Sequence, residues 1–178
     1  MLDLRNKENI IFDLGGVLLN IDYHLTANAF KSLGMTAFDE IYSQKKQTGL
    51  FNQFETGKIS SEEFVQELKQ AAPEAKEEDI VQAWNAMLLD LPKHRLDFLR
   101  KLKGDFRLFL LSNTNQIHED AFLQIIKDEY GDNLLFEQFE VIHLSHKIGQ
   151  RKPDKACFEF VLDSSCLLYT SPSPRDRS

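Results

Sequence analysis

Three short apolar segments, separated by longer helical patterns, constrain the fold of this 178-residue chain most strongly. They span Asn9 to Phe12, Arg107 to Asn113, and the stretch FEVIHL at residues 139–144. Short apolar runs bounded by turn or polar residues are typical of buried strands, whereas the intervening segments repeat apolar residues at helical spacing. The order of strand, helical insert, helix, strand, helix, strand, helix predicts an α/β fold with a parallel, Rossmann-like sheet.

The longest helical region follows the first strand and interrupts the α/β alternation. Its first predicted helix places four apolar residues on one face: Leu25, Ala29, Phe30 and Leu33. Further along, Ser60 and Glu63 have the spacing of a capping box, which marks the start of another helix. We therefore predict a core built from residues 1–20 and 92–165, with residues 21–91 inserted as a helical domain.

Composition excludes several classes of partner. A net charge of −7 is repelled by nucleic-acid phosphates, so we expect no nucleic-acid partner. No apolar run is long enough to span a membrane, and the N-terminus shows no signal-peptide pattern. The two cysteines, Cys157 and Cys166, suit a reducing compartment better than a disulfide framework. We expect a cytoplasmic protein whose partner is a small molecule.

The last thirteen residues, CLLYTSPSPRDRS, differ abruptly from the rest of the chain. They are rich in Ser, Pro and Arg, which is also typical of a disordered tail. CLLYTSPSPRD resembles one translated reading frame of a transposase adapter used in sequencing-library preparation. We therefore predict that residues 166–178 are non-native and that the parent sequence is truncated near Ser165. Without Arg175, Asp176 and Arg177, the net charge changes from −7 to −8.

Polar side chains stand at the ends of the three predicted strands. Asp13 follows the first strand, Ser112 and Asn113 end the second, and Lys152 lies in the loop GQRKPD after the third. Ligands of open α/β sheets bind at the carboxyl ends of the strands, so these groups are expected to converge. Each motif alone also fits an ordinary turn, a helix cap or a solvated helix start. Their ordered combination is what indicates a site.

An acid, a hydroxyl and an ammonium group at one site suit phosphoryl transfer. A carboxylate such as Asp13 can attack phosphorus, and water then hydrolyses the acyl-phosphate. The transferred group carries negative charge, so catalysis requires fixed positive donors such as Lys152, and usually Mg²⁺. The sequence therefore favours a Mg²⁺-dependent reaction on a small phosphorylated metabolite.

The segments FDLGGVLLNID, FETGKIS, LSNTN and GQRKPD resemble those of haloacid-dehalogenase (HAD) superfamily phosphatases with a helical cap, in the branch of glucose-1-phosphatase-type sugar phosphatases. The resemblance covers about residues 9–165. It implies a phosphomonoester hydrolase that forms an aspartyl-phosphate on Asp13, which is also a Mg²⁺ ligand. It further implies that the Gly15 carbonyl binds the metal and that Lys152 is catalytic. The remaining implied residues contact the phosphate: Ser112, Asn113 and Gly16.

The chain departs from the family pattern at Gly15, where most family phosphatases carry an acidic proton donor. Many members of this branch share the glycine. Asp22 and Glu55 are candidates for the missing proton donor, although Asp22 also fits an ordinary helix-cap residue. Phe51 and Phe54 are expected in the core of the cap, with the alternative that they face the site. The five histidines show no metal-ligand spacing, and two of them are expected nearest the site: His143 and His146.

A second departure concerns the final motif of the family, an acidic pair after a further strand, which supplies the remaining Mg²⁺ carboxylates. No such pair follows Lys152 in the sequence. We therefore expect the final core strands to be missing, the first strand to form an unpaired apolar edge, and this truncated chain to be inactive. A non-catalytic protein that binds a phosphorylated ligand is the alternative function, whereas a true dehalogenase fits the DLGGV surroundings of Asp13 less well.

Overall fold

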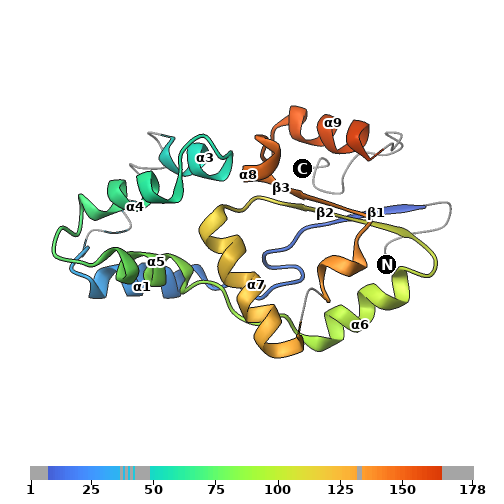
Figure 1. The fold of residues 1–178 in the computed structure, drawn as a ribbon, viewed down its shortest axis with the longest axis horizontal. Helices are drawn as coiled ribbons and strands as arrows, with labels where there is room; N and C mark the ends of the chain where they lie inside the picture. The colour runs from blue at the N-terminus through green and yellow to red at the C-terminus, as the bar shows by residue number, and fades with distance from the viewer. Residues whose placement is uncertain are drawn as a thin grey trace.

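A parallel sheet of three strands organises the computed structural model, which describes residues 8–36, 38, 40, 42, 49–131 and 134–165 (Figure 1). The strands β1 (Asn9–Phe12), β2 (Arg107–Ser112) and β3 (Val141–Leu144) lie in the order β1-β2-β3. Both neighbouring pairs are parallel, with Ile10 opposite Leu108 and Leu110 opposite Ile142. The predicted α/β class and the three predicted strands are confirmed.

Helices cover both faces of this sheet (Figure 1). On one face lie α6 (Lys93–Leu102) and α7 (Gln116–Tyr130), and on the other lies α9 (Lys155–Ser164). Alternate residues of β2 point to opposite faces, as the pleat of a strand requires. Leu108 and Leu110 join the buried cluster on the α6 and α7 side, while Leu111 packs with two residues of α9: Cys157 and Val161. The short 3₁₀ helix η1 (Phe136–Gln138) precedes β3, and α8 (Ser145–Ile148) follows it directly.

The edge position of β1 changes one expectation about its burial. In the described part of the chain, β1 pairs with β2 only, and Ile11 is 40% exposed. The prediction of a buried first strand is therefore wrong for this side chain, because nothing described covers that position. The central strand β2 is by contrast buried from Leu108 to Ser112. Residues 166–178, predicted to be non-native, lie outside the described residues.

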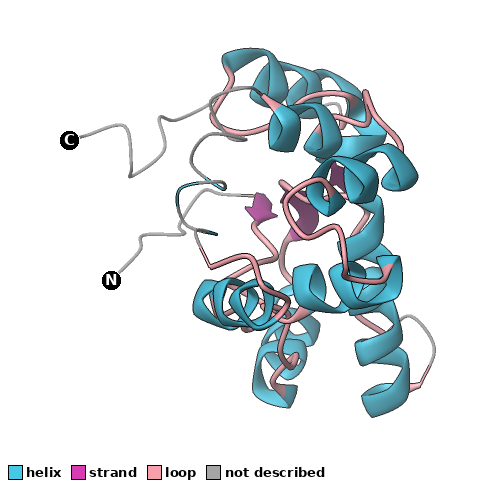
Figure 2. Cartoon of the chain, turned by 90° about the vertical axis from the view of Figure 1, so that its left-hand side faces the viewer, coloured by secondary structure: helices cyan, strands magenta, loops and turns pink. Residues whose placement is uncertain are grey.

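Between β1 and α6, the described residues form a separate helical layer that includes α1 (Tyr23–Ser32), α3 (Leu50–Glu55), α4 (Ser61–Lys69) and α5 (Glu77–Asn85). The capping box is confirmed, because the Ser60 hydroxyl accepts from the Glu63 amide and the Glu63 carboxylate accepts from the Ser60 amide. Figure 2 shows helices above and below the short strands. We call this layer the helical cap.

Aromatic side chains fill the interior of the helical cap. Phe51 stacks on Trp84 with ring centroids 5.5 Å apart, and Phe54 stacks on Phe64 at 4.1 Å. Both Phe51 and Phe54 are buried, which places them in the cap core and not in the site. Such pairs contribute about 0.5–1.5 kcal/mol each beyond the apolar area that they bury.

The expected apolar face of α1 is correct at Phe30 and wrong at Leu25. Phe30 is fully buried, whereas Leu25 is 40% exposed. Thr26 points inward instead, where its hydroxyl donates to the carbonyl of Trp84 at 3.1 Å and accepts from the amide of Met87 at 3.1 Å. A polar side chain is stable there because both of its hydrogen-bonding capacities are satisfied.

The two chain segments that join the cap to the core lie antiparallel to each other. Ile21 forms a bridge with Leu88, the amide of Asn20 donates to the carbonyl of Asp90 at 2.9 Å, and the amide of Leu89 donates to the carbonyl of Asn20 at 3.0 Å. The Asn20 side chain adds a bond to the Asp90 carboxylate at 2.9 Å. The insert therefore begins and ends at one place.

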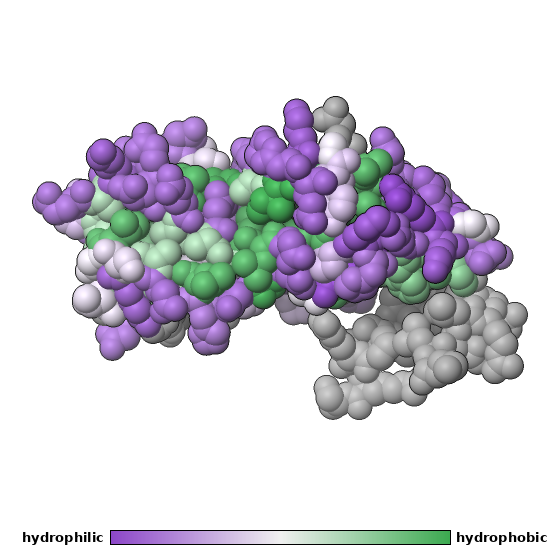
Figure 3. All heavy atoms as spheres, turned by 90° about the horizontal axis from the view of Figure 1, so that it is seen from below, coloured by the Kyte–Doolittle hydropathy of each residue, from purple (hydrophilic) through white to green (hydrophobic). Residues whose placement is uncertain are grey.

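Seen from below, hydrophilic residues cover most of the periphery, and hydrophobic residues gather in the middle of the face (Figure 3). Within the described residues, no helix combines the length and the apolar character needed to cross a membrane.

Candidate active site

Asp13 and Lys152 meet at the carboxyl edge of the sheet. Asp13 follows β1 directly, and its Oδ1 lies 2.7 Å from Nζ of Lys152. The Lys152 ammonium also donates to the carbonyl of Leu111 in β2 at 2.9 Å, which fixes it over the strand ends. Both side chains remain partly exposed, 35% for Asp13 and 21% for Lys152, so a ligand can reach them. The structure thus brings the Asp13 carboxylate and the Lys152 ammonium together at the strand ends, as the sequence predicts.

The turn after Asp13 holds this carboxylate in place. The amide of Leu14 donates to Asp13 Oδ1 at 2.8 Å. Gly16 has a φ of +73°, a conformation that glycine adopts without strain, and its amide donates to the carbonyl of Leu19 at 2.8 Å. The Gly16 N–H is therefore engaged within the turn, and its contact with a substrate stays a prediction.

The carbonyl of Gly15, which is predicted to bind a metal, follows the turn residue Leu14 after Asp13. The Gly15–Leu19 bridge uses the amide of Gly16 and the carbonyl of Leu14, so its hydrogen bonds do not involve the Gly15 carbonyl. The described residues contain no cluster of three or more His, Cys, Asp or Glu side chains suited to a metal. A carboxylate and a carbonyl nevertheless fit Mg²⁺, which prefers oxygen ligands and keeps several waters.

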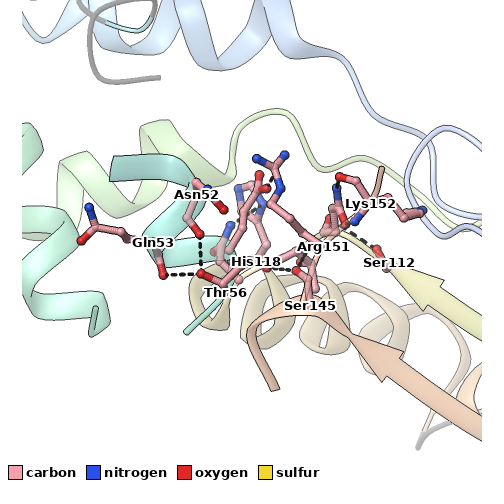
Figure 4. Close-up of polar contacts among 12 residues, drawn as sticks. Asn52, Gln53, Thr56, Ser112, His118, Ser145, Arg151 and Lys152 are labelled. Atoms are coloured by element: carbon pink, nitrogen blue, oxygen red, sulfur yellow. Dashed lines mark hydrogen bonds and ion pairs between the residues drawn. The ribbon is translucent and has the colours of Figure 1, made fainter. Parts of the chain in front are cut away.

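Ser112 ends β2 beside Lys152 (Figure 4). It is only 3% exposed, and its hydroxyl makes a long bond of 3.4 Å to the carbonyl of Asn113. A bond of this length is weak, because good hydroxyl bonds measure about 2.5–3.0 Å. The hydroxyl is therefore weakly held, and its contact with a phosphate stays a prediction.

Asn113 holds the Lys152 loop through its side chain. Its Oδ1 accepts from the amide of Lys152 at 2.8 Å, and its Nδ2 donates to the carbonyl of Lys152 at 2.8 Å. Both ends of the amide are engaged with the backbone of one residue. The phosphate contact expected for Asn113 stays a prediction, and the structure adds a positioning role that sequence reasoning missed.

The helical cap contributes charge close to this edge. Glu55, the last residue of α3, forms an ion pair with Arg151, with 2.9 Å between Oε2 and Nη2. Tyr23 is 63% exposed, yet partial desolvation of its hydroxyl raises its pKa, and the negative charges of Glu55 and Asp13 raise it further. Tyr23 is therefore within electrostatic reach of both carboxylates. Sequence reasoning singled out Glu55 and missed Arg151 and Tyr23.

Comparison with known proteins places this arrangement in a family. Residues 7–165 match the family model described as haloacid dehalogenase-like hydrolase. The chain belongs to this family. It is 30% identical over 164 residues to D-ribitol-5-phosphate phosphatase of Bacteroides thetaiotaomicron, which covers 90% of this chain and 78% of that protein. The expected HAD-like fold and phosphatase class are thereby confirmed.

Solved structures agree with this assignment to the HAD-like hydrolases. The HAD family enzyme BT-2542 of Bacteroides thetaiotaomicron superposes with a TM-score of 0.83 at 31% identity, over 90% of this chain and 79% of that one. The same enzyme in complex with magnesium and inorganic phosphate superposes with a TM-score of 0.81 at 30% identity, with the same coverage.

His118 of this HAD-like hydrolase anchors the helical cap to the core. On α7, its Nε2–H donates to the carbonyl of Trp84 in α5 at 3.1 Å, and its ring stacks on the Trp84 ring at 4.9 Å. Its Nδ1 accepts from the side-chain Nδ2 of Asn115 at 3.2 Å. Burial lowers the pKa of His118 to about 4, so the ring is neutral at physiological pH. His118, which the sequence did not distinguish from an ordinary core or surface residue, thus connects the core helix α7 to the cap helix α5.

The two histidines expected nearest the site have different surroundings. His146 Nε2 lies 3.0 Å from the buried carboxylate of Glu119, and its backbone carbonyl is covered by Gly57 of the cap. His143 Nε2 lies 3.0 Å from the hydroxyl of Ser165 on the α9 side of the sheet. His146 therefore lies at the contact between the helical cap and the core. His143 lies on the face of the sheet that α9 covers.

Proposed function

We propose that the protein is a Mg²⁺-dependent phosphomonoester hydrolase that acts on a small phosphorylated metabolite of the sugar-phosphate type. The observation that carries the proposal is the 2.7 Å pair of Asp13 and Lys152 at the carboxyl edge of the sheet, beside Ser112. The similarity to a phosphatase of D-ribitol 5-phosphate supports a substrate of this type. A carboxylate can form an aspartyl-phosphate intermediate, and a cation beside it can stabilise the charge of the phosphoryl group.

In the proposed reaction, a carboxylate oxygen of Asp13 attacks phosphorus, and the bond between phosphorus and the leaving oxygen breaks. Water then attacks the phosphorus of the aspartyl-phosphate, which releases inorganic phosphate and restores the carboxylate. Lys152 and Ser112 stabilise the negative charge on the phosphoryl oxygens in both steps. Asp13 and the carbonyl of Gly15 would hold Mg²⁺, which would supply further neutralisation of this charge.

Gly15 offers no proton donor for the leaving oxygen, and this favours the alternative function. Of the two candidate donors, Asp22 caps α1 by accepting the amide of His24 at 2.9 Å, and Glu55 pairs with Arg151. A protein that binds a phosphorylated ligand without turning it over is therefore the second candidate. It would use the same contacts from Lys152 and Ser112.

We further propose that residues 21–91 act as a cap over this site, with residues 1–20 and 92–165 as the catalytic core. The paired segments around Ile21 and Leu88 support this division, as does the separate aromatic interior of the cap. The ion pair of Glu55 and Arg151 joins the two parts close to Asp13.

The test is an Asp13→Asn variant of the full-length protein, assayed for phosphate release from sugar phosphates with and without Mg²⁺. We expect loss of activity by at least a thousandfold, because an amide is a poor nucleophile. Asp105→Asn, which removes the same charge from an exposed loop, should keep wild-type activity. Unchanged hydrolysis by Asp13→Asn would disprove the nucleophile. Calorimetric binding without any wild-type turnover would favour the alternative.

A further inference from the structure

We propose that Glu55 and Arg151 form a charge-neutral selector, which favours substrates with an uncharged, hydroxylated leaving group over substrates whose leaving group carries a second anion. This inference rests on the proposed phosphatase function, because it concerns the part of the substrate that leaves. It names the class of substrate that the site accepts.

The selector lies one residue from the catalytic cation. Arg151 precedes Lys152, and consecutive Cα atoms are about 3.8 Å apart. Arg151 therefore pairs with Glu55 of the cap while Lys152 pairs with Asp13 of the core, at 2.9 Å and 2.7 Å respectively. In-line displacement places the leaving group on the side of phosphorus opposite the attacking Asp13 oxygen. A leaving group directed towards the cap can therefore contact Glu55 and Arg151.

The backbone around Glu55 is firmly held. The hydroxyl of Thr56 donates to the carbonyl of Asn52 at 2.7 Å, which closes the end of α3 (Figure 4). Gly57 follows with a φ of +66° and packs against the backbone carbonyl of His146. Figure 4 shows Arg151 between this end of α3 and Lys152. A carboxylate on a fixed backbone can discriminate between ligands, because it does not move away from an unfavourable one.

The charges of the pair explain the direction of selection. Glu55 accepts hydrogen bonds from hydroxyl groups, and the Arg151 guanidinium donates to hydroxyl oxygens. A second anion gains little from Arg151, because Glu55 cancels its charge. The pair is partly exposed, 24% for Glu55 and 29% for Arg151, so the effective dielectric lies between water and protein interior. At such a site, removing one charge about 6 Å from an anion changes affinity roughly tenfold.

Arg151 retains one donor for a ligand-dependent contact. Its Nε is buried and has no hydrogen-bond partner among the described residues. A buried, unpaired donor is costly, so a small shift of the guanidinium that offers this N–H to a substrate oxygen is favourable. The electrostatic effect of Glu55 and Asp13 on the Tyr23 hydroxyl agrees with a site that extends between the two carboxylates.

The experiment compares two probes of similar size, glycerol 3-phosphate and 3-phosphoglycerate, whose leaving groups differ in carrying a hydroxymethyl or a carboxylate. Calorimetry gives the ratio of their dissociation constants for each protein. Glu55→Gln, which keeps the shape of the side chain, should shift the ratio about tenfold towards 3-phosphoglycerate by freeing the Arg151 charge. Arg151→Gln should shift it in the opposite direction by leaving Glu55 uncompensated.

The matched control is Glu78→Gln, which removes one charge from an exposed position of α5 and should keep the ratio within twofold of wild type. Ratios within twofold of wild type for both Glu55→Gln and Arg151→Gln would overturn the inference. Phosphate release is measured on the same proteins. A wild-type protein that binds both probes but releases no phosphate contradicts the proposed function, while the binding ratios still decide the charge selection.

Discussion

Gly57 is the point at which the loop after α3 presses onto the core, and replacing it tests this contact directly. A Cβ on residue 57 would lie 2.3 Å from the backbone carbonyl oxygen of His146, about 1 Å short of ordinary contact. The obstacle is backbone, so no side chain can rotate away. Gly57→Ala should cost about 1–2 kcal/mol for the left-handed φ of +66° and about 1–3 kcal/mol for the overlap.

Gly34→Ala is the matched control, because Gly34 has a φ of +89° and nothing within 4 Å of an added Cβ. Urea unfolding should show that Gly57→Ala loses about 1–3 kcal/mol more than Gly34→Ala. In thermal unfolding, each kcal/mol corresponds to about 2–4 °C for a chain of this size. Equal losses within about 0.5 kcal/mol would refute the contact, since both variants share the φ penalty and the same change in the unfolded state.

Three further predictions concern the site and its support. Asn113→Ala should lower the free energy of unfolding by about 1–3 kcal/mol and phosphate release at least tenfold, because both bonds to the Lys152 backbone are lost; unchanged kinetics would exclude the positioning role. Because the pKa of His118 is about 4 in the folded protein and 6.5 in the unfolded chain, only the unfolded chain binds a proton between these pH values. The free energy of unfolding is therefore highest above pH 6.5 and falls by up to about 3 kcal/mol towards pH 4. His118→Gln should flatten this part of the profile of unfolding free energy against pH, and an unaltered slope would contradict it. Asp22→Asn should keep activity within about twofold, because Asn caps a helix as well as Asp does, whereas a hundredfold loss would make Asp22 the proton donor.

The meeting of Asp13 and Lys152 was predictable from the sequence because a general rule covers it. Parallel strands bring their carboxyl ends to one edge, so residues that follow different strands approach each other whatever their separation along the chain. The capping box at Ser60 was predictable because both of its partners lie within four residues. Such features depend on strand order or on local spacing alone.

The contacts between cap and core could not be predicted in this way. His118 and Trp84 belong to different helices, and their pairing depends on how the cap docks. The ion pair of Glu55 and Arg151 depends on the same docking. The segments FETGKIS and GQRKPD, which contain these residues, do not indicate that they meet. Leu25 was misassigned because helical spacing alone does not reveal that Thr26 finds two hydrogen-bond partners in the interior.

The antiparallel pairing of Ile21 with Leu88 has a consequence for how such proteins diversify. Because the segments around Ile21 and Leu88 are adjacent, the residues between them leave the core and return to it at the same place. Their number and sequence can change by insertion, deletion or exchange without altering the register of β1 and β2. A two-residue hairpin turn can replace the helical cap and yield a minimal core, to which a different cap can be joined.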